Sequence, residues 1–307
     1  MQRFIIIRLI YAAFTLCAVS IIIFSLARVT GNPLDVLLPD EATNADRERV
    51  AAVWGLDRPL HEQYFTYMNN VFHGNFGDSI KWRGKTAREL LLSRLPATLQ
   101  LAAFAMVIAV CLALPIGVMA AVKKDSGVDF AGKVVALLGQ SLPSFWLGIV
   151  LMWIFAVNLN WFPTSGRGGL KHMVLPAVSL GWFQVAAVMR LTRSSMLEVL
   201  DTEYVKLARI KGISELKVIW KHCLRNAALA PLTYFGLILG GFIAGSIVIE
   251  TVFSWPGVGL LSIEAVRARD FQVVQTVVLF IATIYIASSL MVDILYAYLD
   301  PRIRFNR

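Results

Sequence analysis

Gly84-Lys85-Thr86 has the residue types that end a phosphate-binding loop. Such a loop needs a glycine five residues before Gly84, because the turn must bring successive backbone N–H groups onto the phosphates. Position 79 is serine instead, and no other glycine-rich phosphate loop is present. We therefore expect this chain to bind no ATP or Mg²⁺ itself and to hold no cofactor.

Residues that could form a metal or catalytic site are scattered. No metal-ligand spacing is found among the four histidines, His61, His73, His172 and His222. No pair of cysteines falls in one exported segment among Cys17, Cys111 and Cys223, so no disulfide is expected. No pattern brings a nucleophile and a base together. We predict no catalytic residue and no metal site.

Two acidic residues, Glu250 and Asp293, lie near the ends of apolar blocks. Charge at membrane depth is costly and usually functional, which makes both candidates for a translocation pathway. The alternative is that each lies near an interface and satisfies a local partner. We favour the local role for Glu250 and leave both roles open for Asp293.

The composition indicates an all-α integral membrane protein. The chain has 307 residues, of which 57% are hydrophobic and 16% charged, against about a quarter charged in soluble domains. A membrane-spanning helix needs roughly 17–25 apolar residues. Six blocks qualify and predict six spans, at residues 9–27, 99–122, 134–157, 173–189, 229–249 and 273–295.

Two of these blocks need comment. Block 9–27 follows Arg3 and Arg8, as a signal peptide would, but it is too long and has no cleavage site, so we expect a retained span. Block 173–189 is the weakest, because Pro176 and Gln184 interrupt it. If it did not span, the charged segment after it would lie outside the cell.

The distribution of lysine and arginine predicts the orientation. With a cytoplasmic N-terminus, the inner loops and termini carry sixteen of these residues and the two short outer loops carry four. The long segment between the first two spans is left out, because the positive-inside rule applies to short loops. Both termini are therefore expected in the cytoplasm. The same bias accounts for the net charge of +9 without nucleic acid.

Residues 30–96 are expected to form an external subdomain between the first two spans. The segment has turn-forming residues at Gly31-Asn32-Pro33, Gly74-Asn75 and Gly77-Asp78. Its aromatic side chains either form a modest core or meet a partner outside, and we favour the core. They are Trp54, Tyr64, Phe65, Tyr67, Phe72, Phe76 and Trp82.

The fifth block contains two pairs of small residues at helical spacing. These are Gly236 with Gly240 and Gly241 with Gly245. Such pairs let helix backbones approach closely in lipid. We favour packing within this chain, and the alternative is a subunit interface or a pathway wall.

The charged segment between spans 4 and 5 is predicted to be two helices joined by a glycine. Residues 203–211 suit a short helix that ends at Gly212 in the left-handed conformation, and Ser214 suits the N-cap of the next. Leu216, Ile219, Cys223 and Ala227 then recur at helical spacing. This unit either lies on the membrane surface or docks on a partner.

These residues resemble a known family. Glu203-Tyr-Val-Lys-Leu-Ala-Arg-Ile-Lys-Gly212 and Lys221-His-Cys-Leu-Arg-Asn226 are similar to the cytoplasmic loop of permeases of bacterial ATP-binding-cassette importers, in the dipeptide, oligopeptide and nickel branch. The likeness runs the whole length, with further matches at residues 190–200, 250–259, 292–296 and 300–302. It departs from the broader pattern at Lys206-Leu207-Ala208 and Arg225, and Leu207 and Ile210 are bulkier than the branch leads us to expect.

The resemblance implies a machine of five parts in the bacterial inner membrane. They are two different permeases, two cytoplasmic ATPases that bind ATP and Mg²⁺, and a periplasmic or lipid-anchored solute-binding protein. This chain would be the first permease, with residues 1–29 as N-terminus and first span and residues 97–307 as transmembrane domain. Its coupling loop, at about 194–228, would fit a cleft on one ATPase.

The coupling residues that the resemblance implies combine a charged and an apolar set. Glu203, Lys206, Arg209 and Lys211 are expected beside Tyr204, Val205 and Ala208, facing an apolar cleft with a polar rim, before Gly212. Short peptides are the expected cargo. Glutathione, nickel-chelate or opine uptake is the alternative within the family, and an intramembrane enzyme or membrane assembly factor is the alternative outside it.

Overall fold

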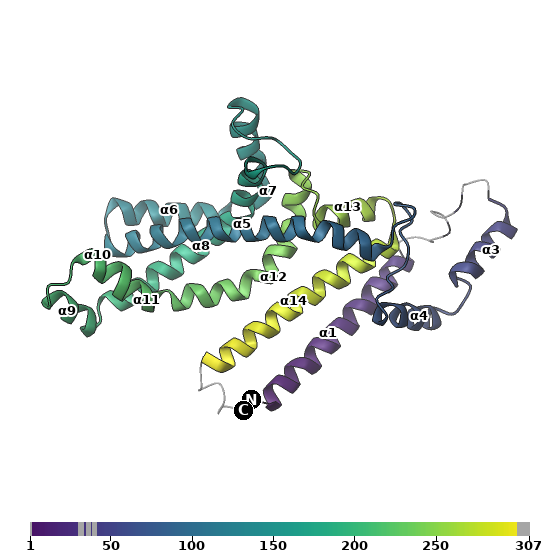
Figure 1. Ribbon diagram of the computed structural model, residues 1–307, viewed down its shortest axis with the longest axis horizontal. Coiled ribbons are helices and arrows are strands. Elements are labelled where there is room, and N and C mark those ends of the chain that lie inside the picture. Colours follow the sequence, from purple (N-terminus) through teal and green to yellow (C-terminus); the bar gives the residue numbers. More distant parts are fainter. Residues whose placement is uncertain (1, 30–33, 35–37, 39–41, 300–307) are drawn as a thin grey trace. The chain divides into compact units, whose positions relative to one another are not determined.

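The computed structural model describes residues 2–29, 34, 38 and 42–299 and divides into two compact units (Figure 1). Unit 1 comprises residues 1–98 and 256–307, and unit 2 comprises residues 99–255. The described residues are mainly helical and contain one isolated β-bridge, between Asp78 and Thr86. Most of residues 30–41 and the matched segment 300–302 lie outside the described part of the chain.

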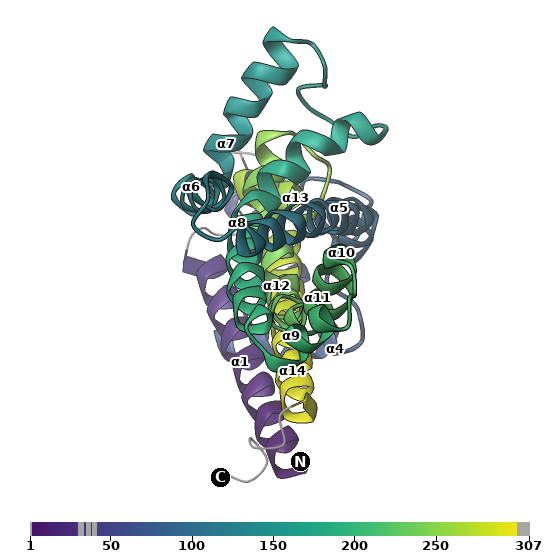
Figure 2. The same cartoon turned by 90° about the vertical axis from the view of Figure 1, so that its left-hand side faces the viewer.

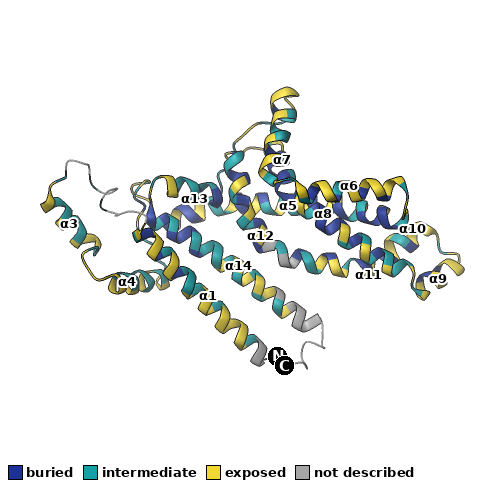
Figure 3. Cartoon of the chain, turned by 180° about the vertical axis from the view of Figure 1, so that it is seen from behind, coloured by how far each residue is buried: buried dark blue, intermediate teal, exposed yellow. Residues whose placement is uncertain are grey.

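Unit 1 contains two long apolar helices. Helix α1 (Gln2–Val29) and helix α14 (Phe271–Leu299) lie side by side (Figure 1). Most side chains of α1 are exposed (Figure 3), as expected of a span whose apolar surface faces lipid. The shorter helices of the unit are α3 (Asn44–Trp54), α4 (Leu60–Phe72) and α13 (Val258–Arg267). Helix α5 (Ala87–Val122) begins in unit 1 and continues into unit 2.

Residues 74–86 are fastened to the rest of unit 1 by polar contacts. The Ser79 hydroxyl donates to the Asp270 carboxylate over 2.5 Å, and the backbone N–H of Lys81 donates to the same oxygen over 3.0 Å. Ser79 therefore has a structural role at the position where a phosphate loop would need glycine. Beneath it, a buried cluster unites α5, α13 and α14, with Phe76 and Trp82 packed on its edge.

The aromatic side chains of the segment between the first two predicted spans divide between the two expected roles. Phe76 and Trp82 pack on that cluster, and Phe24 of α1 contacts the rings of Tyr64 and Tyr67. Phe65 and Phe72 of α4 instead remain exposed. The expected core exists, but it leaves part of the aromatic surface open to lipid or to another molecule.

Unit 2 is built around α8 (Leu170–Leu200), which packs against α6 (Gly127–Ser141), α7 (Ser144–Leu151) and α12 (Leu229–Val252). Pro176 lies inside α8 without ending it. Helices α6 and α12 extend along α8 on separate sides (Figure 2). Helix α8 contains the predicted span 173–189, which was the weakest of the six by sequence. It is the most buried of the long helices of unit 2 (Figure 3).

The predicted third span, 134–157, is not one straight helix. Helix α6 ends at Ser141, and the chain turns by 107° before α7 and a π-helical turn at Met152–Asn158. Pro143 explains the break, because a proline disfavours helical backbone at the residue before it. Leu142 accordingly has an extended backbone, with φ −90° and ψ 125°.

Four described helices are long and apolar enough to cross a membrane, or up to six if each bent pair is one span. The four are Ile5–Val29 within α1, Ala87–Val122, Leu170–Leu200 and Phe271–Met291 within α14. The bent pairs are α6 with residues 144–158, and the two halves of α12, which meet at 59°. The chain is thus a multi-pass membrane protein.

Candidate partner-docking site

The loop between α8 and α12 presents a short helix held in a fixed position. Helix α9 (Glu203–Ile210) starts after Thr202, and the turn that closes it contains Gly212, whose φ is +74°. The N–H of Gly212 donates to Arg209 O over 2.9 Å, and the N–H of Ile213 donates to Ala208 O over 3.3 Å. These two bonds form a Schellman motif, which satisfies carbonyls at the end of the helix. The predicted glycine-terminated helix is confirmed.

The inner face of α9 differs from the one expected. Val205 is fully buried and Ala208 nearly so, because both pack into a cluster of this chain with Val118, Met196 and Cys223. They cannot line a partner's cleft, so the expectation that they face outward is wrong. Their burial fixes α9 to the ends of α5 and α8, and it therefore makes the helix a rigid extension of those elements.

The outer face of α9 is both apolar and charged. Leu207 is 52% exposed and Ile210 84% exposed, with Tyr204 beside them. Glu203, Lys206, Arg209 and Lys211 are exposed along the same helix, and Lys206 forms an ion pair with Glu203 over 2.8 Å. Exposed branched apolar side chains of this size, surrounded by charges, are typical of an interface core with a polar rim.

A second segment braces α9. Helix α10 (Glu215–Lys217), a π-helical turn (Val218–Cys223) and helix α11 (Leu224–Ala227) lie beside it (Figure 2). The Arg209 guanidinium binds the Glu215 carboxylate, with its closest N–O distance 2.7 Å, and this pairing raises the pKa of Arg209. The Asn226 amide donates to the Tyr204 hydroxyl over 2.8 Å.

The π-helical turn changes which residues of this second segment are buried. Val218, Cys223 and Ala227 are buried, whereas Leu216 is 71% exposed. The predicted stripe began at Leu216, because it assumed a regular helical period that the wider turn does not keep. Ser214 occupies the predicted N-cap position, but its side chain makes no capping bond.

A buried ion pair fixes the base of α8 to α6. The Arg193 guanidinium donates to both carboxylate oxygens of Asp129, over 2.6 and 2.9 Å, and Lys133 lies 2.9 Å from the same group. The Asp129 side chain has no exposed surface, while Arg193 retains 20%. Bidentate pairs of this kind hold a fixed geometry. No sequence pattern predicts this contact, because its partners are 64 residues apart.

Single glycines and alanines, rather than a paired motif, make the closest helix approaches in unit 2. A Cβ at Gly117 would lie 2.8 Å from Met189 O, one at Gly139 would lie 2.7 Å from Ala186 Cβ, and one at Gly181 would lie 2.8 Å from Ala105 O. Larger residues there would force α5 or α6 away from α8.

The predicted glycine pairs of α12 behave differently. A Cβ at Gly241 would meet none of the described atoms within 4 Å, and one at Gly245 would meet only Leu180 Cδ1, at 3.8 Å. Gly240 is buried, and the surroundings of Gly236 lie outside the description. Within unit 2, close packing of Gly241 and Gly245, which we had favoured, is therefore not what holds α12.

Both acidic residues have local partners. Glu250 is fully buried and accepts a hydrogen bond from the Ser246 hydroxyl over 3.0 Å. Asp293 of α14 pairs with Arg8 of α1 over 2.9 Å. Glu250 thus has the local partner that we favoured for it. The pair of Asp293 with Arg8 joins the two long helices of unit 1. Among the described residues, no three His, Cys, Asp or Glu side chains are grouped as a metal site would need.

Comparison with known sequences identifies the family. Residues 113–305 match the model described as binding-protein-dependent transport system inner membrane component. Residues 1–102 match the model for the N-terminal part of such membrane components. The chain belongs to this family of inner-membrane transport components.

Full-length relatives agree. The chain is 36% identical to the oligopeptide transport system permease protein AppB of Bacillus subtilis, over 99% of this chain and 100% of the relative. It is 38% identical to the di/tripeptide transport system permease protein DppB of Pseudomonas aeruginosa, over 95% and 96%. It is 37% identical to the dipeptide transport system permease protein DppB of Escherichia coli K12, over the whole of both chains.

The resemblance to this family of permeases is thus confirmed. The chain is a permease subunit of an ATP-binding-cassette importer, and ATP hydrolysis belongs to separate ATPase subunits. The family implies an ATPase and a substrate-binding protein as partners.

Proposed function

We propose that this chain is the first permease of a heterodimeric importer that moves di- and oligopeptides into the cytoplasm. The names of the full-length relatives support a peptide cargo. Two cytoplasmic ATPases bind ATP and Mg²⁺, and a periplasmic or lipid-anchored protein delivers the solute. Glutathione, nickel-chelate and opines are the competing cargoes.

In this proposal the chain crosses the inner membrane six times, with both termini in the cytoplasm. Residues 30–96 form the external subdomain, and residues 97–307 form the transmembrane domain. The bent pair α6–α7 and the bent helix α12 each count as one span. The excess of lysine and arginine on the inner side supports this orientation.

Helix α9 is the coupling helix within the loop 194–228. The observation that carries this assignment is its exposed pair Leu207 and Ile210 on a helix whose other face is locked into the chain. An ATPase cleft that encloses these two side chains can move α9 as a rigid body, and buried Val205 and Ala208 pass that movement to α5 and α8.

Gly241 and Gly245 face a neighbour in the assembled importer, namely the second permease or the translocation pathway. Their open surroundings within unit 2 support this role. Asp293 holds α14 to α1 through Arg8, and Glu250 is bonded within α12 by Ser246, so neither is assigned to the cargo.

Solute uptake tests the cargo. A strain that lacks this chain should lose uptake of labelled tripeptide and regain it when the gene is restored. Unlabelled dipeptides should compete, whereas nickel-chelate, glutathione and opines should not. If only one of these other solutes competes with tripeptide uptake, that solute is the cargo instead.

A further inference from the structure

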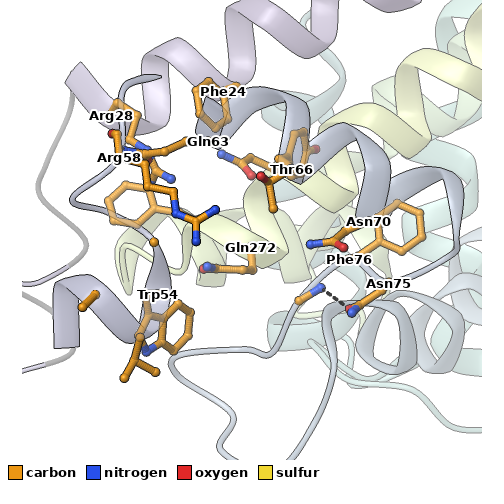
Figure 4. A pocket seen from close by; sticks show the side chains of 17 residues that line it. Phe24, Arg28, Trp54, Arg58, Gln63, Thr66, Asn70, Asn75, Phe76 and Gln272 are labelled. Atoms are coloured by element: carbon orange, nitrogen blue, oxygen red, sulfur yellow. Dashed lines mark hydrogen bonds between the residues drawn. The ribbon is translucent and has the colours of Figure 1, made fainter. Parts of the chain in front are cut away.

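Unit 1 contains a polar cavity of about 390 Å³ in its external part (Figure 4). Its walls come from the end of α1, from α3 and α4, from residues 75–77 and from the start of α14. This volume falls within the range of small-molecule sites. Every described lining residue belongs to unit 1.

Several buried polar atoms around the cavity have no hydrogen-bond partner among the described residues. They are Arg28 Nε, Gln63 Oε1, Tyr67 OH and Gln272 Oε1. A buried polar group without a partner is unfavourable, because it has lost its hydrogen bonds to water without replacing them. Four such groups around one space therefore indicate that another molecule completes their bonding.

The two amide oxygens are acceptors in search of N–H donors. The Gln63 amide nitrogen already donates to Leu56 O and Arg58 O, over 3.2 and 2.8 Å, which fixes its Oε1 as the unpaired atom. Gln272 can extend past Gly77 because glycine has no side chain. A Cβ at Gly77 would lie only 2.9 Å from the Cγ of Gln272. The Gly77 N–H is held in turn by Asn75, over 3.0 Å (Figure 4).

The charge of the cavity selects an anion. Arg28 and Arg58 line it, and no aspartate or glutamate does among the residues that the structure describes. Figure 4 shows the Arg58 guanidinium directed into the same space as Gln63 and Gln272. The Tyr67 hydroxyl is protonated at neutral pH, as in any tyrosine, and burial raises its pKa further, to about 12. Phe24, Trp54 and Phe76 supply apolar walls.

We propose that this cavity binds a small zwitterion in which an anionic group lies near N–H donors. Arg28 and Arg58 bind the anionic group, and the amide oxygens of Gln63 and Gln272 accept from the N–H groups. Two sources carry this chemistry: a free peptide with its terminal carboxylate, and the phosphoethanolamine headgroup of a lipid at the outer surface. The peptide source rests on the proposed function, whereas the lipid source does not.

Binding to the full-length chain in lipid nanodiscs tests the proposal. The first probe is labelled trialanine, with trialanine amide as the form that lacks the carboxylate, in discs free of phosphatidylethanolamine. The second probe is phosphatidylethanolamine added to the discs, with retained lipid counted by native mass spectrometry. The test variants are Arg58→Gln and Gln272→Leu. Arg83→Gln, an exposed external arginine outside the cavity, is the matched control.

Either of two results supports the proposal. The peptide source is identified if trialanine binds the wild type and Arg83→Gln but binds Arg58→Gln at least about tenfold more weakly. Trialanine amide should then bind the wild type as weakly as trialanine binds Arg58→Gln. Phosphatidylethanolamine that both cavity variants lose identifies the lipid source. The proposal is overturned if neither probe binds, or if both cavity variants bind like the control. If the cavity proposal fails in this way while cells still take up peptide, the cavity is not a binding site but the proposed transport function is unaffected.

Discussion

At the residue scale, the end of α9 depends on one glycine. Gly212 has a left-handed φ of +74°, and a Cβ there would meet no described atom within 4 Å. The demand for glycine is therefore conformational and not steric. The sequence sufficed to predict this position, because a left-handed helix terminus depends on a residue type and its spacing alone.

Replacing Gly212 tests that demand. Gly212→Val should strain the turn by about 1–2 kcal/mol, because a β-branched residue is disfavoured at positive φ, and it should abolish solute uptake while membrane insertion stays normal. Gly212→Asn is the matched control, since asparagine tolerates this conformation, and it should retain most uptake. Equal uptake by both variants would remove the turn from the coupling mechanism.

The same scale shows where prediction from sequence stopped. The apolar residues of α9, at 204, 205, 207, 208 and 210, cover a wide arc of this short helix. The pattern alone therefore left open which apolar residues face inward. Only the packing on Val118 and Met196 decides that Val205 and Ala208 are inside and that Leu207 and Ile210 are outside.

At the element scale, helix breaks and long-range pairs were the least predictable features. Pro143 could have signalled the break between α6 and α7, because a residue before proline favours extended backbone. Hydropathy alone merged the two helices into one span. The Asp129–Arg193 pair had no sequence signal, since it depends on how α6 packs on α8.

The Asp129–Arg193 pair should be what keeps α6 against the base of α8. Asp129→Asn should weaken it by about 1–3 kcal/mol, the usual worth of hydrogen bonds to charged groups. The expected result is a melting temperature of the purified chain lowered by several degrees. Asp125→Asn is the control for the loss of a neighbouring negative charge. The Asp125 carboxylate acts on Arg193 through its charge, its backbone N–H donates to Asp129, and its φ of 59° suits asparagine. Equal melting temperatures for the two variants would show that the Asp129–Arg193 pair does not stabilise the fold.

At the scale of the whole molecule, membrane class and approximate span positions followed from hydropathy. The boundaries did not: α5 begins at Ala87, well before the predicted block at 99, because its first turns pack in the buried cluster with α13 and α14. Helix α13 was not predicted at all, since its ten residues are too short to register as a span.

The proposed orientation predicts the outcome of reporter fusions. Alkaline phosphatase, which is active only outside the cytoplasm, should be active when fused after Gly74 and inactive when fused after Gly212. The physical reason is the sixteen-to-four bias of basic residues toward the inner loops. The opposite pattern would reverse the topology and place α9 out of reach of any ATPase.

The central claim is that the exposed face of α9 docks on a partner ATPase, and photo-crosslinking at Ile210 tests it most directly. A benzoylphenylalanine at Ile210 should form an adduct that contains the ATPase in intact cells, because this side chain is 84% exposed on a helix anchored from behind. The same group at Phe72, which is 81% exposed in the external segment, should form none. The account is contradicted if neither Ile210 nor Leu207 yields an ATPase adduct in a variant that is inserted and still transports its solute.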